Sequence, residues 1–466
     1  MKVKELVSKI NLPARATMGY LGASLVGKAI GILTTPFFTR LISEEEYGAL
    51  TLYMTVLGGA SVICSAVSSG SAVYRGFKTF ENKNGGFTKS VLAVSFVFSL
   101  VICLLLFALI PFLGLNQAFY IPLVLQILCD SIIGVSMSRA RFRYKYGEVM
   151  AVGIISSAIP ALISLAILTW LGKGFGVRIY SLLAISLIVA AIQLARILSL
   201  PGRSNKEMRK YMIRSSVPLL PHSISVALSG QADKLFITTF MGAAALAKYS
   251  VVHSLGIALQ FVITALGSAL GPWMIRRLDT GEDYRIRRVI STLFSLFCTL
   301  SLGLCALAPE AMQILAPGEY LEALPALIPI ALSTPLSFLS YTITVSLVHA
   351  EKGKYTALIS AVNLALCVLL NYTLIPSLGY FGAGLALLLS QLGGAVIGIW
   401  LISRAEICQV FYAKNGIARF IVSCLIGGLT MLFFNSLSLR IILLLIPAVW
   451  GLNGLFECKR LVIEAK

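Results

Sequence analysis

Apolar stretches of about 20 residues recur along the whole chain and are separated by short polar connections. A helix of this length crosses the ~30 Å hydrocarbon core of a bilayer. The pattern therefore predicts an all-α polytopic membrane protein with about fourteen transmembrane helices. The predicted spans are residues 17–39, 49–73, 90–111, 117–138, 148–170, 179–198, 215–239, 249–273, 289–308, 323–348, 355–375, 381–402, 418–436 and 440–456.

Lys and Arg alternate between heavily and sparsely charged connections. The set that includes both termini carries 31 of the 38 Lys and Arg, whereas the other set carries 5. In these totals Arg196, Arg419 and Arg440, each within three residues of a span end, are counted with the adjoining connections. The remaining two, Lys28 and Lys234, lie deeper inside predicted spans. Because short cytoplasmic loops collect Lys and Arg, we expect both termini to face the cytoplasm.

The composition excludes an ordinary soluble protein and a nucleic-acid-binding protein. Hydrophobic residues make up 58% of the 466 residues, above the usual soluble range. The formal charge of +19 is spread over many short loops, so no basic strip could follow a phosphate backbone. The nine Cys contain no C-x-x-C pair, so we expect no disulfide framework, metal or cofactor.

The first six predicted spans recur in the second half of the chain. Residues 39–50, TRLISEEEYGAL, precede residues 238–249, TTFMGAAALAKY, by 199 positions, and Phe175-Gly176 has its counterpart in Phe381-Gly382. Two parallel repeats with a cavity between them are typical of transporters. We expect six-helix bundles over 1–200 and 215–403, a cytoplasmic linker over 201–214, and two further transmembrane helices within 404–466.

One apparent nucleotide-binding motif carries no such function. Residues 22–29, GASLVGKA, differ at the last place from the phosphate-binding pattern G-x-x-x-x-G-K-[ST], because Ala29 replaces the hydroxyl that would bind Mg²⁺. The motif also lies within a predicted span. We therefore expect neither ATP hydrolysis nor any other enzyme activity.

Three stretches resemble the polysaccharide-biosynthesis flippases of the multidrug/oligosaccharidyl-lipid/polysaccharide (MOP) exporter superfamily. They are residues 39–50, residues 231–250, QADKLFITTFMGAAALAKYS, and residues 361–386, AVNLALCVLLNYTLIPSLGYFGAGLA. The most similar subgroup is the O-antigen repeat-unit flippases (Wzx-like). This resemblance implies a bacterial cytoplasmic (inner) membrane protein with a MATE-like fold. It also implies alternating access and the transfer of an undecaprenyl-pyrophosphate-linked oligosaccharide of O-antigen, capsule or exopolysaccharide. Polysaccharide polymerase and glycosyltransferases are the implied partners.

Ionisable residues within the bilayer are costly and are the first functional candidates. Lys28 lies near the middle of the first span, on one helix face with Ser24 and Thr35. Such a central cation could neutralise a pyrophosphate, and we expect Lys234 and Arg40 to contribute to the same anion site. The alternative is that Lys28 pairs with an acid only to hold two helices together.

Two acids are candidates for coupling transport to a proton or a sodium ion. Asp233 follows His222, Ser225 and Ser229 at helical spacing, and Asp130 lies in the fourth span. A carboxylate away from water can take up a proton near neutral pH. A static pair of Asp233 with Lys234 or Lys28 explains the sequence equally well. His222 is a third coupling candidate, although an interfacial position accounts better for it.

Further polar residues are candidates for a cytoplasmic vestibule and for the lining of the cleft. The vestibule would gather the anionic lipid headgroup, although positive-inside topology explains most of these arginines as well. The expected vestibule residues are Arg75, Arg139, Arg143 and Arg276; the expected lining residues are Ser24, Thr35, Ser225, Ser229 and Asn363.

Other functions fit the same architecture. A multidrug cation antiporter of the same superfamily would share the fold but not the substrate, and a peptidoglycan-precursor lipid flippase would share the substrate class. A membrane scaffold would not need a charged cleft between repeats. The central position of Lys28 and the RLISEEEYG motif favour an anionic lipid substrate.

Overall fold

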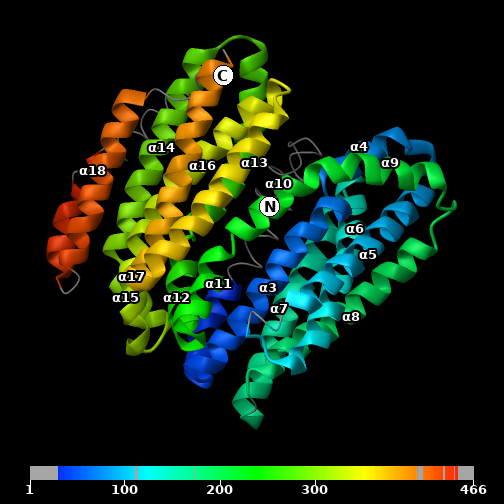
Figure 1. Ribbon diagram of the computed structural model, residues 1–466, viewed down its shortest axis with the longest axis horizontal. Coiled ribbons are helices and arrows are strands. Elements are labelled where there is room, and N and C mark those ends of the chain that lie inside the picture. Colours follow the sequence, from blue (N-terminus) through cyan, green and yellow to red (C-terminus); the bar gives the residue numbers. More distant parts are fainter. Residues whose placement is uncertain are drawn as a thin grey trace, which may run out of the picture. The chain divides into compact units, whose positions relative to one another are not determined.

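The computed structural model describes residues 30–109, 111, 114–172, 174–405, 407, 413–433, 436–445 and 447–449. The chain divides into two compact units, Met1–Gln231 (unit 1) and Ala232–Lys466 (unit 2). The described part of each unit consists of helices joined by short connections (Figure 1).

Unit 1 begins, within the described residues, with a helix over 30–41. Helix α6 packs against α3, α5 and α8, and α7 packs against α8. The elements are α3 (Glu44–Ser68), α4 (Ser71–Thr79), η1 (Glu81–Lys83), α5 (Asn84–Leu109), η3 (Gln117–Phe119), α6 (Tyr120–Phe142), α7 (Tyr146–Leu171), α8 (Gly176–Leu198), α9 (Lys206–Ser216), η4 (Val217–Leu219) and α10 (Leu220–Ser229).

In unit 2, α16 packs against α14 and α17, and α11 packs against α12 and α17. Residues 437–445 and 447–449 are also helical. The elements are α11 (Ala232–Met241), α12 (Ala243–Gly256), α13 (Gln260–Asp279), α14 (Asp283–Ala306), α15 (Ala308–Leu315), η5 (Gly318–Ala326), α16 (Leu327–His349), α17 (Gly353–Arg404) and α18 (Ala413–Leu432).

The order of elements in unit 1 recurs in unit 2. Helix α14 begins 199 residues after α5, and α16 and α17 begin 207 residues after α6 and α7. The break at 42–43, before α3, has its counterpart at Gly242, before α12. This agreement follows the duplication seen in the sequence, where the offset drifts because of small insertions.

The side chains have the polarity expected of helices surrounded by lipid. On α5 the hydroxyls of Ser95 and Ser99 are buried, whereas Leu104 is 72% exposed. Small polar residues between helices and large apolar residues on the outside are typical of membrane proteins, because lipid solvates the apolar side chains. The chain is therefore a multi-pass membrane protein.

The described residues contain eight helices long and apolar enough to span a membrane, or nine if the bent pair of α12 and the start of α13 forms one span. This number is smaller than the predicted total of about fourteen for two reasons. The first span and the last two lie partly outside the described residues, and the predicted eleventh and twelfth spans are both within α17.

The predicted seventh span, 215–239, is not one continuous helix. It comprises η4, α10 and α11, with an interruption at Gly230 and Gln231 that coincides with the boundary between the units. Pro218 and Pro221 lack backbone N–H donors, and Gly is a weak helix former, so this segment is locally unsuited to an uninterrupted helix. The preceding stretch, predicted as a linker, contains α9, which packs on α4 and α5 of unit 1.

Helix α17 is a hairpin of two arms that meet at Gly379. The backbone there has φ 56° and ψ −132°, a conformation that favours glycine. A Cβ at Gly382 would overlap the carbonyl oxygen of Leu374, and a Cβ at Gly394 would lie 3.7 Å from Cγ of Asn363. Glycines in the second arm thus allow the two arms to lie close together.

Candidate functional site

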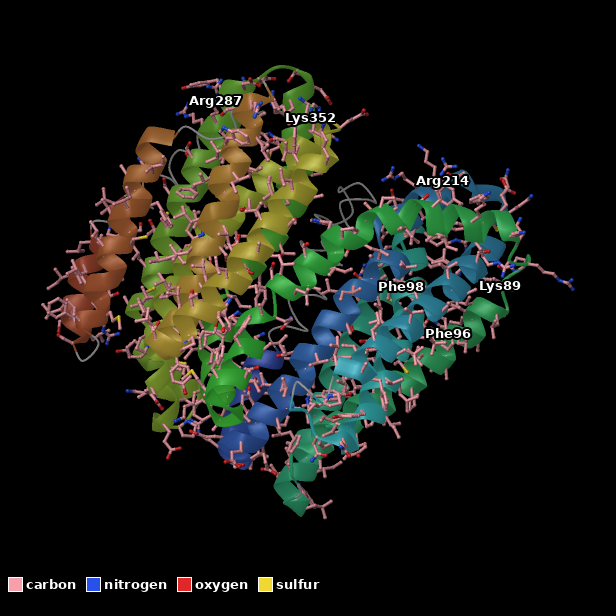
Figure 2. The ribbon with its side chains drawn as sticks, in the orientation of Figure 1. Lys89, Phe96, Phe98, Arg214, Arg287 and Lys352 are labelled. Atoms are coloured by element: carbon pink, nitrogen blue, oxygen red, sulfur yellow. The ribbon has the colours of Figure 1, made fainter. Side chains whose placement is uncertain are left out.

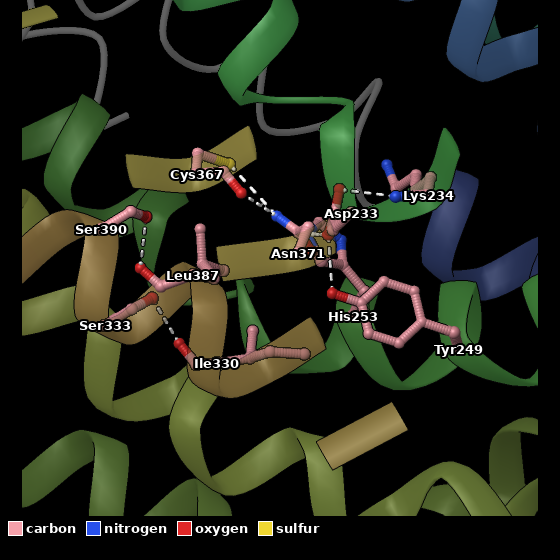
Figure 3. Close-up of polar contacts among 10 residues, drawn as sticks. All are labelled: Asp233, Lys234, Tyr249, His253, Ile330, Ser333, Cys367, Asn371, Leu387 and Ser390. Atoms are coloured by element: carbon pink, nitrogen blue, oxygen red, sulfur yellow. Dashed lines mark hydrogen bonds and ion pairs between the residues drawn. The ribbon is translucent and has the colours of Figure 1, made fainter. Parts of the chain in front are cut away.

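A buried carboxylate with two side-chain partners lies inside unit 2. Asp233, on α11, is 4% exposed. Tyr249 Oη donates a hydrogen bond to Asp233 Oδ2 at 2.6 Å, and His253 Nε2 lies 3.4 Å from the same oxygen. The other carboxylate oxygen accepts from the backbone N–H of Lys234 at 2.9 Å. Figure 3 shows these contacts together.

Local geometry explains why these three side chains meet. Gly242, with φ 90°, separates α11 from α12 and allows a tight reversal between the two packed helices. Tyr249 and His253 are four residues apart on α12 and therefore lie on the same face of that helix. The reversal directs this face toward Asp233.

Helix α17 contributes two further buried side chains. Asn371 Nδ2 donates to the carbonyl oxygen of Cys367 at 2.7 Å and lies 3.4 Å from its Sγ. Asn371 Oδ1 is buried and makes no hydrogen bond within the part of the chain that the structure describes. Because α11 packs against α17, these residues enter the same region as Asp233 (Figure 3). We call Asp233, Tyr249, His253, Cys367 and Asn371 the Asp233 cluster.

The Asp233 cluster can hold a proton or a small cation. A carboxylate away from water is costly unless hydrogen bonds or a positive charge compensate it. Here a phenol, an imidazole and a backbone amide surround it. The orphan amide oxygen of Asn371 adds an oxygen acceptor that a cation would satisfy.

Unit 1 contains a second acid within a predicted span, and this acid is half-buried between packed helices. Asp130, on α6, accepts hydrogen bonds from Ser61 Oγ at 2.9 Å and from Gln126 Nε2 at 3.1 Å. The same Gln126 nitrogen lies 2.7 Å from Ser186 Oγ on α8. The carboxylate therefore joins α3, α6 and α8, and its recorded hydrogen-bond donors are uncharged. Among the described residues, each unit thus contains an acid, Asp130 or Asp233, that accepts side-chain hydrogen bonds between helices.

The predicted anion site lies only partly within the described residues. Lys28 and Ser24 fall outside them. Thr35 Oγ1 donates to the carbonyl of Gly31 at 3.0 Å, and exposed Arg40 donates to the carbonyl of Pro36 at 2.9 Å. Lys234 is half-buried beside Asp233. The pairing of Asp233 with Lys28 stays a prediction.

The predicted shared face of His222, Ser225, Ser229 and Asp233 is divided by the structure. The first three residues lie on α10 in unit 1, whereas Asp233 lies on α11 in unit 2. Ser225 Oγ donates to the carbonyl of Pro221 at 2.9 Å, a bond within its own helix. The helix is interrupted at Gly230 and Gln231, and a common face of these four residues stays a prediction.

The predicted vestibule arginines lie at helix ends. Arg75 on α4 and Arg143 after α6 are exposed, and Arg139 is half-buried with its Nε lacking a partner among the described residues. Arg276, at the end of α13, is exposed in unit 2. Asn363 faces Gly394 across the α17 hairpin, and its Oδ1 likewise lacks a described hydrogen-bond partner.

Sequence reasoning did not identify Tyr249 and Asn371 as partners of the acid. The available signal was weak: Tyr249 and His253 form a polar pair at i and i+4 within a predicted span. Their role depends on the reversal at Gly242, which a helical pattern alone does not reveal.

Comparisons with known proteins agree with this architecture. The family model described as polysaccharide biosynthesis protein matches residues 14–277. The chain is 24% identical to the succinoglycan biosynthesis transport protein ExoT of Rhizobium meliloti (strain 1021), over 70% of this chain and 69% of the relative. It is 23% identical to the probable low-salt glycan biosynthesis flippase Agl15 of Haloferax volcanii, over 91% of each chain.

Solved structures show the same fold. The lipid II flippase MurJ, in an inward closed conformation, matches with a TM-score of 0.72 and 13% identity, over 95% of this chain and 99% of that chain. An inward-facing multidrug resistance MATE family transporter of the MOP superfamily matches with a TM-score of 0.58 and 16% identity, over 81% of this chain and 95% of that chain.

Proposed function

Since the chain belongs to the polysaccharide biosynthesis protein family, we propose that it flips an undecaprenyl-pyrophosphate-linked oligosaccharide across the bacterial inner membrane. The cargo would be a repeat unit of O-antigen, capsule or exopolysaccharide, moved from the cytoplasmic to the outer leaflet by alternating access. Family and fold support a role among the flippases and transporters of the MOP superfamily, and the two relatives named for glycan transport support a glycan cargo.

The observation that carries the proposal is the recurrence of one helical order in two units, with a hydrogen-bonded acid between helices in each: half-buried Asp130 and buried Asp233. The described elements outside the candidate spans, such as α9 and α15, are short. Repeated bundles with polar groups at membrane depth serve transport better than a static scaffold, because buried ionisable groups are costly to retain without a function.

We assign the coupling step to the Asp233 cluster, with Asp130 and its hydrogen-bond partners Ser61 and Gln126 as the second candidate. Uptake of a proton or sodium ion at Asp233 would change the charge inside unit 2 and thereby bias one conformation over another. The pyrophosphate would bind the predicted anion site of Lys28, Lys234 and Arg40, since cations and phosphates form strong charge-assisted hydrogen bonds.

The test uses the full chain in proteoliposomes that contain fluorescent undecaprenyl-pyrophosphate oligosaccharide in one leaflet. We expect transfer to the other leaflet, driven by an imposed pH or sodium gradient. Lys28→Ala should abolish transfer, whereas Lys83→Ala, at an exposed position of η1, should not. Export of cationic drugs without glycan transfer would establish the antiporter instead. Preference for lipid-linked peptidoglycan precursor would establish that cargo.

A further inference from the structure

A groove on unit 1 shares no lining residue with Asp130 and its hydrogen-bond partners. It has a volume of about 370 Å³ and runs between α5 and the consecutive elements α9, η4 and α10. One wall consists of Ala93, Val94, Val97, Phe98 and Val101; the other consists of Arg209, Ile213, Ser216, Val217 and Leu220, with Val67 of α3 as a further contact.

Hydrogen bonds join the segments that form the two walls near one end, which we call the closed end. At the closed end Lys89 Nζ donates to the carbonyl of Leu200 at 2.8 Å, and Ser90 Oγ lies 2.9 Å from Ser204 Oγ. Lys89, at this end, and Phe98, further along α5, are labelled in Figure 2. Val97 is 61% exposed and Val217 is 52% exposed, so the groove is accessible from the surrounding lipid.

Ser216 gives the groove a polar feature that the fold itself does not use. It is 1% exposed, and its hydroxyl makes no hydrogen bond with any described residue. A serine within a helix usually donates to the carbonyl four residues earlier. A buried hydroxyl without a partner costs free energy, so an acceptor from outside the chain would be favourable here.

The mouth of the groove is cationic. Arg209 lines it and is exposed, and its recorded hydrogen bond, to the carbonyl of Asn205 at 3.4 Å, uses Nε rather than the terminal nitrogens. The rest of α9 adds Lys206, Lys210 and Arg214 against one acid, Glu207. By the charge distribution this helix lies at the cytoplasmic face, where anionic lipids are concentrated.

We propose that this groove binds an anionic diacyl phospholipid of the cytoplasmic leaflet. One acyl chain lies against the valines of α5, the phosphate contacts Arg209, and an ester carbonyl accepts a hydrogen bond from Ser216. Arg209 and Ser216 are seven residues apart, or about 10 Å along a helix, and the long arginine side chain spans part of that distance. Arg209 and Ser216 are therefore spaced so that one lipid can bind the first through its phosphate and the second through an ester carbonyl.

The orphan hydroxyl favours a phospholipid over a polyprenyl phosphate. A polyprenyl chain carries no carbonyl near its phosphate, so it would leave Ser216 unsatisfied. The assignment does not depend on the cargo of the transporter. The proposed phospholipid would bind to α9 and α10, the helices that immediately precede unit 2 in the chain.

The experiment titrates delipidated full-length protein with single lipids and measures apparent Kd by native mass spectrometry. The probes are phosphatidylglycerol, phosphatidylcholine with the same chains, the dialkyl ether form of phosphatidylglycerol, and undecaprenyl phosphate. We expect phosphatidylglycerol to bind about fivefold more tightly than phosphatidylcholine, from about 1 kcal/mol per basic residue. The ether form should bind more weakly than the ester form.

Matched variants separate this site from general surface attraction. Val97→Trp fills the groove and Arg209→Gln removes its cation, so both should abolish the preference for phosphatidylglycerol. Their controls, Leu104→Trp on α5 and Arg214→Gln on α9, lie outside the groove and should retain it; Figure 2 shows Arg214. Ser216→Ala should bind the ester and ether forms equally.

Three outcomes overturn the proposal. Equal effects of Arg209→Gln and Arg214→Gln would indicate diffuse attraction to α9. Equal binding of ester and ether lipids by the unaltered protein would remove the role of Ser216. Displacement of phosphatidylglycerol by undecaprenyl phosphate from the unaltered protein but not from Val97→Trp would assign the groove to the polyprenyl chain.

Discussion

Tyr249 donates a 2.6 Å hydrogen bond to Asp233, and both side chains are buried within unit 2. The bond joins two helices that a single glycine, Gly242, separates in the chain. It fixes the carboxylate beside the imidazole of His253. An ionisable centre of this kind has both a structural effect and a functional one, and the two can be measured separately.

Replacement of Tyr249 by Phe should destabilise the protein by about 1–3 kcal/mol, because a buried carboxylate oxygen loses a hydrogen-bond donor. The measurement is thermal unfolding in detergent. The control is Tyr372→Phe, at a 61% exposed tyrosine whose recorded contacts are aromatic. Equal decreases in unfolding temperature for the two variants would show that the hydrogen bond from Tyr249 to Asp233 does not stabilise the protein.

Asp233→Asn should keep the fold, since the amide oxygen can still accept from Tyr249, but should lose the response to an ion gradient. We expect gradient-driven transfer of the lipid-linked glycan to fall at least about tenfold, or about 1.4 kcal/mol. Asp130→Asn provides the comparison between clusters. If only Asp130→Asn loses the gradient response, the coupling site lies in unit 1.

Glu310 and Arg440 predict a specific acid sensitivity. Arg440, 2% exposed, donates to both carboxylate oxygens of Glu310, at 2.9 and 2.6 Å. These hydrogen bonds lower the pKa of Glu310 below its usual value. A lowered folded-state pKa contributes stability above the unfolded value, about 4.3, and that stability is lost as the pH falls further.

The unfolding temperature of the unaltered protein should therefore fall more steeply between about pH 5 and pH 3 than that of Glu310→Gln. Glu319→Gln, at an exposed position of η5, is the control and should retain the steep fall. Parallel curves for the unaltered protein and Glu310→Gln would contradict the assignment.

The α17 hairpin should not tolerate a side chain at Gly382. Ala there would place Cβ against the carbonyl of Leu374, and overpacking of this kind costs about 1–3 kcal/mol. Gly303→Ala on α14 is the matched substitution, since nothing lies within 4 Å of its Cβ position. It should raise stability by up to about 1 kcal/mol through helix propensity. Circular dichroism melts of both variants measure the difference.

The RLISEEEYG motif has a structural explanation at the start of α3. Ser43 Oγ accepts from the backbone N–H of Glu46, and a Glu46 carboxylate oxygen accepts from the N–H of Ser43, both at 3.2 Å. This is a reciprocal capping box. Ser43→Ala should cost about 1 kcal/mol, whereas Glu45→Ala should cost less. Equal unfolding temperatures for Ser43→Ala and Glu45→Ala would show that the capping box does not stabilise α3.

Regular elements were predictable because apolar length alone defines them. The predicted spans 148–170 and 179–198 agree with α7, Tyr146–Leu171, and α8, Gly176–Leu198, to within a few residues. Because lipid surrounds such helices, their positions can be predicted from the apolar pattern without knowing the tertiary contacts. The same pattern failed at Gly230, where backbone propensity interrupts an apolar run.

Tertiary pairing could not be predicted from local spacing. Arg440 is the first residue of the last predicted span, and nothing in the local pattern indicates that it is buried against Glu310, 130 positions earlier. The acids Asp130 and Asp233 were identifiable because charge is rare within spans. Their partners, such as Ser61 and Tyr249, are ordinary residues whose importance arises only from packing.

The one-residue turn at Gly379 constrains how this protein can rearrange. Glycines of the second arm bring the two arms of α17 into close contact on either side of that turn. We therefore expect a conformational cycle to move Asn363 and Asn371 together with the second arm, and larger displacements to occur elsewhere in unit 2.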